Sequence, residues 1–540
     1  MRKIIALTAA AGLAAGTLAA VPIASAAAAA PAAAAGSIKW STCSDPGLAS
    51  IGGVCGYLAV PLDYGHPKGD KIQLAVSMVR HTSSAAKYQG IMITNPGGPG
   101  GSGLTLSSLG QYVPGSSATT YDWIGFDPRG VGSSIPALSC QPDFFQGPRL
   151  PYIPTSPSLA QKWLAISKSY AQSCGKAQPA LIQHVKTIDT VKDMDQIRIA
   201  LGQKQINFFG FSYGTYLGQV YGTLFPTHVR RMVLDSTVDP RGVWYQANLA
   251  QDIAFERNIN IWFGWLARYD SVYHLGKTAK AVSRLFYAEQ AALYKNPAEG
   301  VVGGSEWNDI FLTAGYYQFT WTELGGVFAG WVNDHDSATL VAEYQGTDGP
   351  GDDNGFAMYD ATQCTDAQWP QKWSTWRKDN WATYKVAPFE TWSNAWYNAA
   401  CLYWPAKAGV PVKVDGSKVK SVLMIDETLD AATPYEGSLW VRHLFPNASL
   451  IAEPGGTTHA GTLFGNACVD DQIAAYLATG KLPQRKPGYG ADTFCAPLPQ
   501  PVPVAPATAA AALADRAAVS AVASTVSTIG RASLTRLVRG

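Results

Sequence analysis

Residues 210–214 read Gly-Phe-Ser-Tyr-Gly, and their surroundings constrain the fold more than any other feature of the chain. A short apolar segment, 205–209, precedes them, and a segment with small residues on one face, 215–222, follows. In the order strand, sharp turn and helix, Gly-x-Ser-x-Gly holds a serine at the exposed tip of the turn. The flanking glycines suit this turn because a Cβ would clash there. The pattern therefore predicts Ser212 as a nucleophile at the edge of a sheet.

Apolar segments on both sides of this turn indicate an alternating chain. The predicted strands are 74–79, 90–94, 122–127, 205–209, 232–235, 419–425 and 449–452. Residues 187–201 carry apolar side chains at helical spacing, and 470–479 is a predicted closing helix. Alternation of this kind is typical of a parallel sheet covered by helices, so the predicted fold class is α/β.

The composition changes along the chain and divides it into segments. They are a leader at 1–36, a first core part at 37–240, a helical insertion at 241–405, a second core part at 406–497 and a Pro- and Ala-rich tail at 498–540. The leader has a basic start, an apolar stretch and the small-x-small site Ala24-Ser25-Ala26, which is typical of a secretion signal. No later apolar run is long enough to span a membrane. We therefore expect a secreted, extracellular monomer with no membrane contact.

The eight cysteines fit an exported protein, because disulfides persist in oxidising surroundings. Sequence alone allows many pairings, and we expect nearest neighbours to pair because each bond would then staple a loop. The expected pairs are Cys43 with Cys55, Cys140 with Cys174, Cys364 with Cys401, and Cys468 with Cys495. No cluster of histidine and cysteine has metal-ligand spacing, so neither a metal nor another cofactor is expected.

The charge and the aromatic content narrow the class of partner. A formal net charge of +2 with 15% charged residues leaves no basic stripe for a nucleic acid. Many of the 17 Trp and 25 Tyr fall between 245 and 405. We interpret this region mainly as packed helices, with an aromatic-lined pocket as a local addition.

Ser212 needs a neighbouring base, because a serine hydroxyl is a poor nucleophile at neutral pH. Of the eight histidines, His459 has the setting for this role. It follows the last predicted strand in the Gly-rich loop 453–461, which can hang an imidazole over the serine. His459 is therefore the predicted base.

The acid that orients the base is expected after the strand at 419–425, because the order along the chain is serine, acid, histidine in this architecture. Asp426, Glu427 and Asp430 all lie there. Asp430 is the preferred acid, and Asp426 is expected to brace the loop. Asp235, after the preceding strand, is the rival position.

Stabilisation of an oxyanion requires two backbone N–H groups. Tyr213, directly after the nucleophile, is the first predicted donor. The second is expected from the Gly-rich loop 95–103, which follows the strand at 90–94 and lets the backbone approach a substrate closely. Gly98 is the preferred donor in this loop, with Gly97 next.

Several motifs together resemble one family of serine peptidases. Residues 96–100, Pro-Gly-Gly-Pro-Gly, look like the His-Gly-Gly-Pro-Gly loop of prolyl iminopeptidases, with Pro96 in place of the histidine. Residues 127–134, Asp-Pro-Arg-Gly-Val-Gly-Ser-Ser, resemble a segment of the same enzymes, and 234–240 and 430–434 also match. With the secretion signal and the C-terminal cysteine pair, the chain is similar to the secreted tripeptidyl aminopeptidases of actinomycete type.

This resemblance implies an α/β-hydrolase fold with a helical cap inserted before the strand that carries the acid. The long interval between Ser212 and Asp430 independently leaves room for such a cap. The implied activity is the release of short peptides, often tripeptides, from the free N-termini of peptide substrates by acyl transfer.

An exopeptidase must also recognise the substrate ammonium, and a carboxylate in the cap is its natural partner. Glu323, in an aromatic setting, is the preferred candidate over Glu306, Glu256 and Asp366. The alternatives to a peptidase are a secreted esterase or lipase with the same triad, a hydrolase of small amides, and a binding protein on a hydrolase fold. The complete set of Ser212, Asp430 and His459 argues against the last.

Overall fold

The computed structural model describes residues 37–348 and 351–503, so the predicted leader and most of the predicted tail lie outside the described residues. The described strands form one mixed sheet in the order β1-β2-β3-β5-β4-β6-β7-β8-β9-β10. Their bounds are β1 (Ser41–Thr42), β2 (Val54–Pro61), β3 (Lys71–Val79), β4 (Ile91–Asn95), β5 (Asp122–Phe126), β6 (Ile206–Phe211), β7 (Val229–Asp235), β8 (Val422–Glu427), β9 (Ala448–Glu453) and β10 (Thr493–Phe494).

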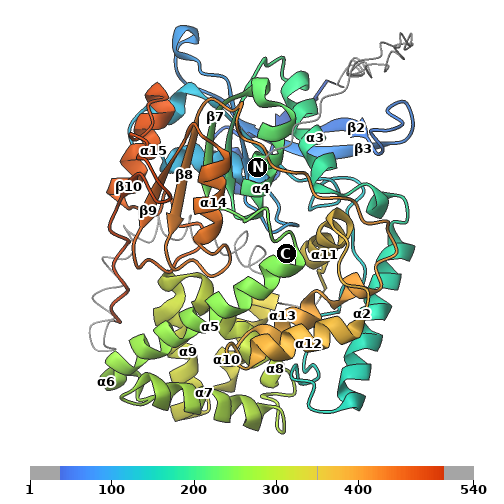
Figure 1. Cartoon of the computed structure of the whole chain (residues 1–540), viewed down its shortest axis with the longest axis vertical. Helices are drawn as coiled ribbons and strands as arrows, with labels where there is room; N and C mark the ends of the chain where they lie inside the picture. Colours follow the sequence, from blue (N-terminus) through green and yellow to red (C-terminus); the bar gives the residue numbers. More distant parts are fainter. Residues whose placement is uncertain (1–36, 349–350, 504–540) are drawn as a thin grey trace, which may run out of the picture. The chain divides into compact units, whose positions relative to one another are not determined.

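The sheet is parallel from β5 through β4, β6, β7, β8 and β9 to β10 and antiparallel at the β1, β2 and β3 edge (Figure 1). This confirms the α/β fold class and all the predicted strands. β2 was not predicted. It pairs with β3 along its whole length, from Val54 opposite Met78 to Pro61 opposite Lys71.

Helices cover both faces of the sheet because its central strands are apolar on both sides. Phe208 packs on one face with helices α3 (Thr187–Ala200), α4 (Tyr213–Leu224) and α14 (Glu436–Leu444). Its neighbour Phe209 packs on the other face with α15 (Ala467–Thr479) and the 3-10 helix η2 (Leu104–Tyr112). Successive strand residues point to opposite faces, so this alternation fixes the sheet between two helical layers.

A helical insertion separates β7 from β8 and agrees with the predicted cap. Its α-helices are α5 (Tyr245–Arg268), α6 (Asp270–Tyr273), α7 (Ala279–Leu293), α8 (Gly304–Tyr316), α9 (Trp321–Asp334), α10 (Ser337–Asp348), α11 (Asn354–Asp366), α12 (Trp373–Tyr384) and α13 (Thr391–Tyr397). The 3-10 helices η6 (Gln318–Thr320) and η7 (Ala399–Leu402) lie between or after them. Trp262, Trp307 and Trp321 are fully buried in the cap, in line with the interpretation of its aromatic residues as packing.

A segment before the cap also packs against it. Helix α2 (Pro157–Ala177) follows β5 in the chain, yet Trp163 stacks on Trp396 of α13 with ring centroids 5.6 Å apart. Tyr170 of the same helix contacts Phe356 of α11. The wall of the cap is thus built from two separate parts of the chain.

The four predicted disulfides are all confirmed. Cys43 is bonded to Cys55, Cys140 to Cys174, Cys364 to Cys401, and Cys468 to Cys495. The last bond joins the start of α15 to the end of β10 and so fixes the point at which the chain leaves the sheet. A short helix, α1 (Pro46–Ser50), lies inside the loop closed by the first.

Candidate active site

Ser212 stands between β6 and α4 in a backbone conformation that few residues adopt, with φ 54° and ψ −126°. A Cβ on Gly210 would lie 2.6 Å from the carbonyl oxygen of Gly214, and one on Gly214 would lie 2.7 Å from that of Asn95. Both positions therefore require glycine, because a Cβ there would lie too close to a backbone oxygen. Strain of this kind persists where the surrounding structure imposes it, and it is concentrated at functional sites.

His459 and Asp430 are brought together from the loops after β9 and β8. Nδ1 of His459 donates to Oδ2 of Asp430 at 2.8 Å, and His459 is 4% exposed. Oδ1 of Asp430 accepts from the backbone N–H groups of Ala432 and Thr433 at 2.8 and 3.0 Å. Because Nδ1 carries the donated proton, Nε2 is the basic nitrogen of the ring.

The ionised form of Asp430 is favoured in this position. Burial by itself raises the pKa of the carboxyl, but the charge and hydrogen bond of His459 and the N–H group of Thr433 hold it below its ordinary value. A buried carboxylate of fixed orientation is what an imidazole needs in order to keep one tautomer and to carry a transient positive charge.

The two rival carboxylates have other partners. Oδ2 of Asp235 accepts from the backbone and the hydroxyl of Thr462, at 3.1 and 2.7 Å. Burial raises the pKa of Asp235 to about 6 against these hydrogen bonds. Asp426 accepts from the hydroxyl of Ser438 and is fully buried. Asp235 thus braces the loop that contains Thr462, whereas Asp426 binds the first turn of α14 and not the loop that the sequence suggested.

The loop of His459 is held from the core on both sides of the imidazole. Glu427 accepts from the backbone N–H of Thr458 at 2.6 Å, and the hydroxyl of Ser236 accepts from that of Ala460 at 2.7 Å. Ser236 belongs to the motif at 234–240, whose role the sequence did not reveal. These contacts limit the freedom of a loop that its glycines would otherwise leave mobile.

The Gly-rich loop passes directly beside the elbow. A Cβ on Gly97 would lie 2.7 Å from Cβ of Ser212 and 3.0 Å from the backbone nitrogen of Tyr213. Gly98 and Tyr213 both line the same cavity as Ser212. The two predicted oxyanion donors are therefore brought to one place.

Asp127, in the motif after β5, fixes this Gly-rich loop. Its Oδ1 accepts from the hydroxyl of Ser102 at 2.6 Å and from the N–H of Gly103 at 3.0 Å. Its Oδ2 accepts from the N–H of Ser133 at 2.7 Å. The motif at 127–134 thus has a physical role, which is to tie the Gly-rich loop to the end of the neighbouring strand.

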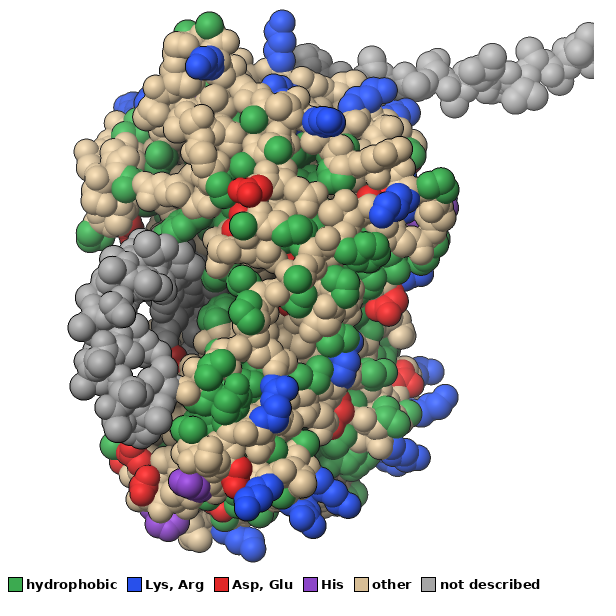
Figure 2. All heavy atoms as spheres, turned by 90° about the vertical axis from the view of Figure 1, so that its left-hand side faces the viewer, with side chains coloured by type: hydrophobic (Ala, Val, Ile, Leu, Met, Phe, Trp, Pro, Cys, Tyr) green, Lys and Arg blue, Asp and Glu red, His purple; other side chains and the backbone are tan. Residues whose placement is uncertain are grey.

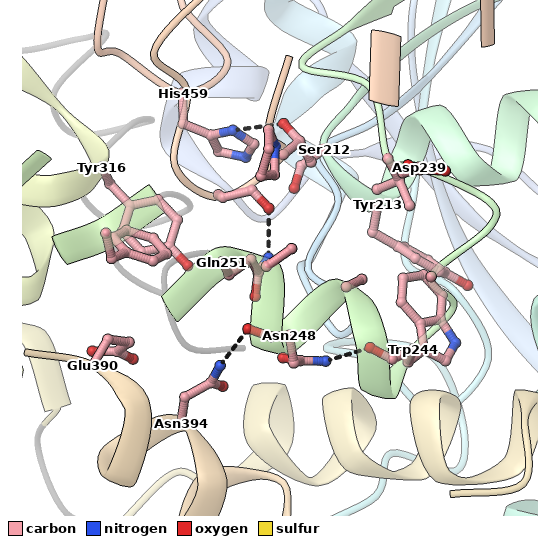
Figure 3. A pocket seen from close by; sticks show the side chains of 18 of the residues that line it. Ser212, Tyr213, Asp239, Trp244, Asn248, Gln251, Tyr316, Glu390, Asn394 and His459 are labelled. Carbon is pink, nitrogen blue, oxygen red and sulfur yellow. Dashed lines mark hydrogen bonds between the residues drawn. The ribbon is translucent and has the colours of Figure 1, made fainter. Parts of the chain in front are cut away.

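A cavity of about 500 Å³ lies between the sheet and the cap. Ser212 and His459 stand next to each other on one side of it, and Glu390 and Asn394 of the cap lie on the opposite side (Figure 3). Tyr316 contributes to the wall beside His459. The cavity has the size of a pocket for a small molecule or a short peptide.

The prediction for Glu323 is wrong, because its side chain is exposed in the first turn of α9 and does not line the cavity. Asp239, Asp309, Glu390 and Glu436 are the carboxylates that do. A single acidic residue in a helical region gives no information about which face of the helix meets a cavity, so the sequence offered no way to choose.

The other cap candidates also lie away from the cavity. Glu306 pairs with Arg149, Glu256 accepts from the backbone of Phe389, and Asp366 accepts from Thr187. Of the four carboxylates that line the cavity, Glu390 and Asp309 are buried. Asp309 pairs with Arg149 and accepts from the hydroxyl of Tyr152 at 2.8 Å.

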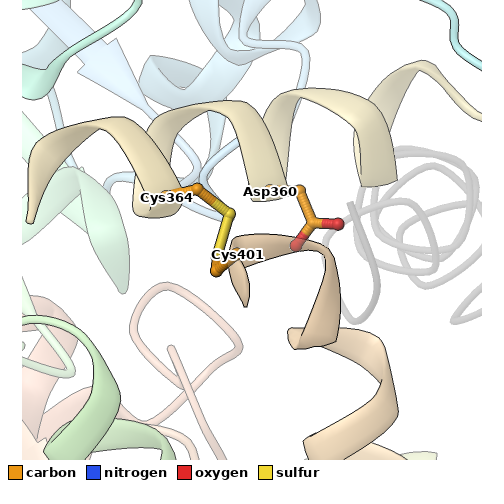
Figure 4. A group of neighbouring side chains, drawn as sticks. All are labelled: Asp360, Cys364 and Cys401. Atoms are coloured by element: carbon orange, nitrogen blue, oxygen red, sulfur yellow. A yellow bond between two sulfur atoms is a disulfide. The ribbon is translucent and has the colours of Figure 1, made fainter. Parts of the chain in front are cut away.

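One group of metal-ligand side chains occurs in the described part of the chain, formed by Asp360, Cys364 and Cys401 (Figure 4). Its two sulfurs are bonded to each other, so in this state the group offers one carboxyl. Neither oxygen of Asp360 has a hydrogen-bond partner, and burial raises the pKa of this carboxyl well above its ordinary value. Burial therefore favours the protonated form of Asp360 in the folded chain.

Replacing Asp360 by asparagine is expected to remove one source of pH dependence from the stability. Above about pH 4 the unfolded chain releases a proton that the folded chain keeps, so the free energy of unfolding falls as pH rises. The free energy of unfolding should therefore fall more steeply with pH for the wild type than for Asp360→Asn, by at most about 1.4 kcal/mol per pH unit. Urea unfolding at several pH values measures this difference. The exposed Asp352→Asn is the control, and parallel curves for wild type and Asp360→Asn would contradict the prediction.

On the face drawn in Figure 2, described Lys and Arg side chains are interspersed with acidic, hydrophobic and uncharged ones. Among the described residues, no helix combines the length and the apolar character needed to cross a membrane.

The mostly parallel sheet between two helical layers, with a serine at positive φ directly after β6, is the fold of an α/β-hydrolase. A profile of the family described as "TAP-like protein" matches residues 387–495. The chain is 40% identical to "Tripeptidyl aminopeptidase" of Streptomyces lividans over 477 residues, which are 86% of this chain and 88% of the relative. The chain belongs to the family of these tripeptidyl aminopeptidases and is a serine hydrolase. The family resemblance drawn from the sequence is thereby confirmed.

More distant relatives carry different names. The chain is 29% identical to "Serine protease Hip1" of Mycobacterium tuberculosis strain H37Rv, over 83% of this chain and 89% of the relative. It is 30% identical to "Carboxylesterase B" of the same strain, over 79% of this chain and 85% of the relative. The family therefore includes proteins named for peptide and for ester hydrolysis.

Proposed function

We propose that this chain is a secreted exopeptidase that releases short peptides, in particular tripeptides, from the free N-termini of peptide substrates. The observation that carries the proposal is the arrangement of the cavity. Ser212 and His459 lie on one side, and the buried carboxyl group of Glu390 lies on the other (Figure 3). The leader and the four disulfides support secretion. We also propose that the chain acts as a monomer.

In the first half of the reaction, Oγ of Ser212 attacks the carbonyl carbon of the scissile bond. Nε2 of His459 takes the serine proton as the new bond forms, and Asp430 stabilises the resulting imidazolium. The negative charge that develops on the carbonyl oxygen is met by the N–H groups of Tyr213 and Gly98. Tyr213 is the first residue of α4, so the positive end of the helix dipole adds to this stabilisation.

Collapse of this intermediate expels the amine of the next residue, which takes the proton from His459. Water then enters, gives a proton to His459 and attacks the acyl carbon. The short peptide leaves with a free carboxylate, and the proton returns to Ser212. Each step uses the same base and the same oxyanion donors, so the site needs no further catalytic group.

Glu390 is the proposed partner of the substrate ammonium. It is 7% exposed and stands at the N-terminal end of α13, in the wall of the cavity. A carboxylate in the wall of a cavity can accept charge-assisted hydrogen bonds from a substrate ammonium. The distance across the cavity would then limit how many residues fit between the ammonium and Ser212, and so set the length of the released peptide.

A tripeptide chromogenic amide with a free N-terminus, its N-acetylated copy and a short-chain ester test this proposal together. Acetylation removes the charge that Glu390 would bind, so we expect kcat/KM for the acetylated copy to fall about 100-fold. Glu390→Gln should lower kcat/KM for the amide with a free N-terminus by a similar factor and leave the rate of ester hydrolysis unchanged. Glu436→Gln, at an exposed carboxyl that also lines the cavity, is the matched control.

The ester distinguishes the second candidate function, which is ester hydrolysis by the same residues. The ester is included as a substrate because one relative is named as a carboxylesterase. If the acetylated amide is cleaved as fast as the free one, the exopeptidase proposal is rejected. If the ester is turned over and neither amide is cleaved, the chain is an esterase.

A further inference from the structure

The backbone N–H of His459 is held by the cap and not by the core. It donates to the carbonyl oxygen of Tyr316 at 2.8 Å, whereas its neighbours Thr458 and Ala460 donate to core residues. The ring of Tyr316 also packs edge-on against the imidazole, with centroids 5.8 Å apart and an interplanar angle of 72°. The orientation of the imidazole therefore depends on where the cap places Tyr316.

Tyr316 is the last residue of α8 and begins a cap contact segment, residues 316–320, that faces the loop of His459. Phe319 in this segment stacks on Phe464 of that loop, with centroids 5.6 Å apart and an interplanar angle of 16°. Phe319 is 46% exposed, so burial of its ring contributes little to holding it in place. Gln318 of the same segment is 7% exposed, and its side chain makes a further contact.

The chain supplies that contact after its last disulfide. In Figure 1 a red segment leaves β10 and runs toward the cap helices. Residues 496–501 of this segment, the C-terminal strap, begin where the carbonyl of Ala496 accepts from Nδ2 of Asn466 at 2.9 Å. Asn466 ends the loop that carries His459 and Phe464, so the strap starts from the core side of the site.

The strap then binds the cap at two elements. The carbonyl of Leu498 accepts from Nε2 of Gln318, inside the cap contact segment, at 2.9 Å. The carbonyl of Pro501 accepts from Nε1 of Trp265 in α5 at 2.9 Å, and the side chain of Gln500 pairs with Arg268 of the same helix. The strap is thus tied to both sides of the boundary between core and cap.

Its sequence suits this role. Prolines alternate with other residues at 497, 499, 501 and 503, and each fixes its own φ. A chain of this kind is extended before it binds, so it loses little conformational entropy when it is laid across a surface. The acceptors are backbone carbonyls, which remain free in such a sequence.

We propose that residues 496–501 are a strap that holds the cap contact segment against the loop of His459 and thereby positions the imidazole for reaction. This inference rests on the proposed function, in which His459 is the base. The strap residues touch neither the substrate nor the reacting atoms, and they act through Gln318 and Tyr316. Loss of the strap should therefore affect turnover more than binding.

Two truncated variants distinguish the effect of the strap from that of the rest of the tail. A chain that stops after Pro503 keeps the strap and loses only residues 504–540, and one that stops after Ala496 keeps the Cys468–Cys495 disulfide and loses the strap. We expect kcat to fall about 10- to 100-fold in the second relative to the first, with KM changed by about threefold or less. Addition of the synthetic peptide of residues 497–503 should restore kcat in a saturable manner.

A variant of the full chain guards against misfolding of the short form. Trp265→Phe with Gln318→Leu removes two donors to the strap and leaves an apolar side chain at each position, so kcat should fall about 3- to 10-fold. If the chain that stops after Ala496 folds and keeps kcat within about twofold, the strap proposal is overturned. If that chain does not fold, an unchanged kcat in the double variant overturns it.

The short-chain ester keeps this test separate from the proposed function. Acylation of Ser212 by the ester requires an oriented base whichever peptide is the natural substrate, so all strap variants are measured with it as well. His459→Ala in the full chain reports on the base itself. If that variant keeps the ester rate, the proposed mechanism fails, and the strap is not the cause.

Discussion

Ser212→Ala is expected to lower kcat for the free tripeptide amide by about 10,000-fold or more, because no other group can form the acyl bond. The methyl group fills the place of the hydroxymethyl without new contacts, and the φ of 54° is imposed by the elbow and not by the hydroxyl. Binding of the substrate should therefore survive. Steady-state kinetics and calorimetric titration with the intact tripeptide amide measure the two effects separately.

A matched serine controls for the change itself. Ser50 is exposed on α1, and Ser50→Ala should leave both kcat and binding unchanged. If Ser212→Ala keeps more than about one hundredth of the wild-type kcat, Ser212 is not the nucleophile and the acyl-transfer mechanism is wrong. If it loses binding as well, the variant has disturbed the elbow and not only the chemistry.

The parts of the site that depend on local structure or on the ends of strands could be predicted. The elbow is a local structure, since Gly210, Ser212 and Gly214 are constrained by one strand, one turn and one helix. His459 and Asp430 were found because each follows a strand, and the carboxyl ends of parallel strands meet at one edge of a sheet. The disulfides were predicted for a similar reason, since each closes a short loop.

The cap was predicted as a region but not in its detail. Which carboxyl group faces the cavity depends on how the cap helices pack on one another and on α2, and their apolar patterns do not fix this. Glu323 is exposed for that reason, whereas Glu390, which the sequence did not single out, lies in the cavity wall. Both residues are single acids among aromatic neighbours.

The contacts that backbone carbonyls make at the boundary between core and cap could not be predicted. Every residue of a chain has a backbone carbonyl group. The carbonyl of Tyr316 accepts from the backbone of His459, and the carbonyl of Leu498 accepts from the side chain of Gln318. Only their placement gives them a role. The side chains around them carry no sign of it, because any residue at position 498 other than a backbone-disrupting one would offer the same acceptor.

Asp430→Asn is expected to lower kcat by about 10,000-fold while the fold and substrate binding are retained. Oδ1 of Asp430 accepts from two backbone N–H groups, of Ala432 and Thr433, so the amide oxygen of asparagine must take this position. The amide nitrogen then faces Nδ1 of His459 and donates to it. The ring is forced into the tautomer that carries its proton on Nε2, and this nitrogen can no longer accept the proton of Ser212.

Asp235→Asn is the matched control, because Asp235 lies at the rival acid position and is equally buried. Its Oδ2 accepts both hydrogen bonds from Thr462, so the oxygen of asparagine can replace Oδ2. This replacement does not change the tautomer of His459. We expect a loss in kcat of about tenfold or less from this change. Pre-steady-state measurement of acyl-enzyme formation compares the two variants directly. If Asp235→Asn shows the larger loss, Asp235 is the acid, and the hydrogen bond between Asp430 and His459 serves only to hold the loop.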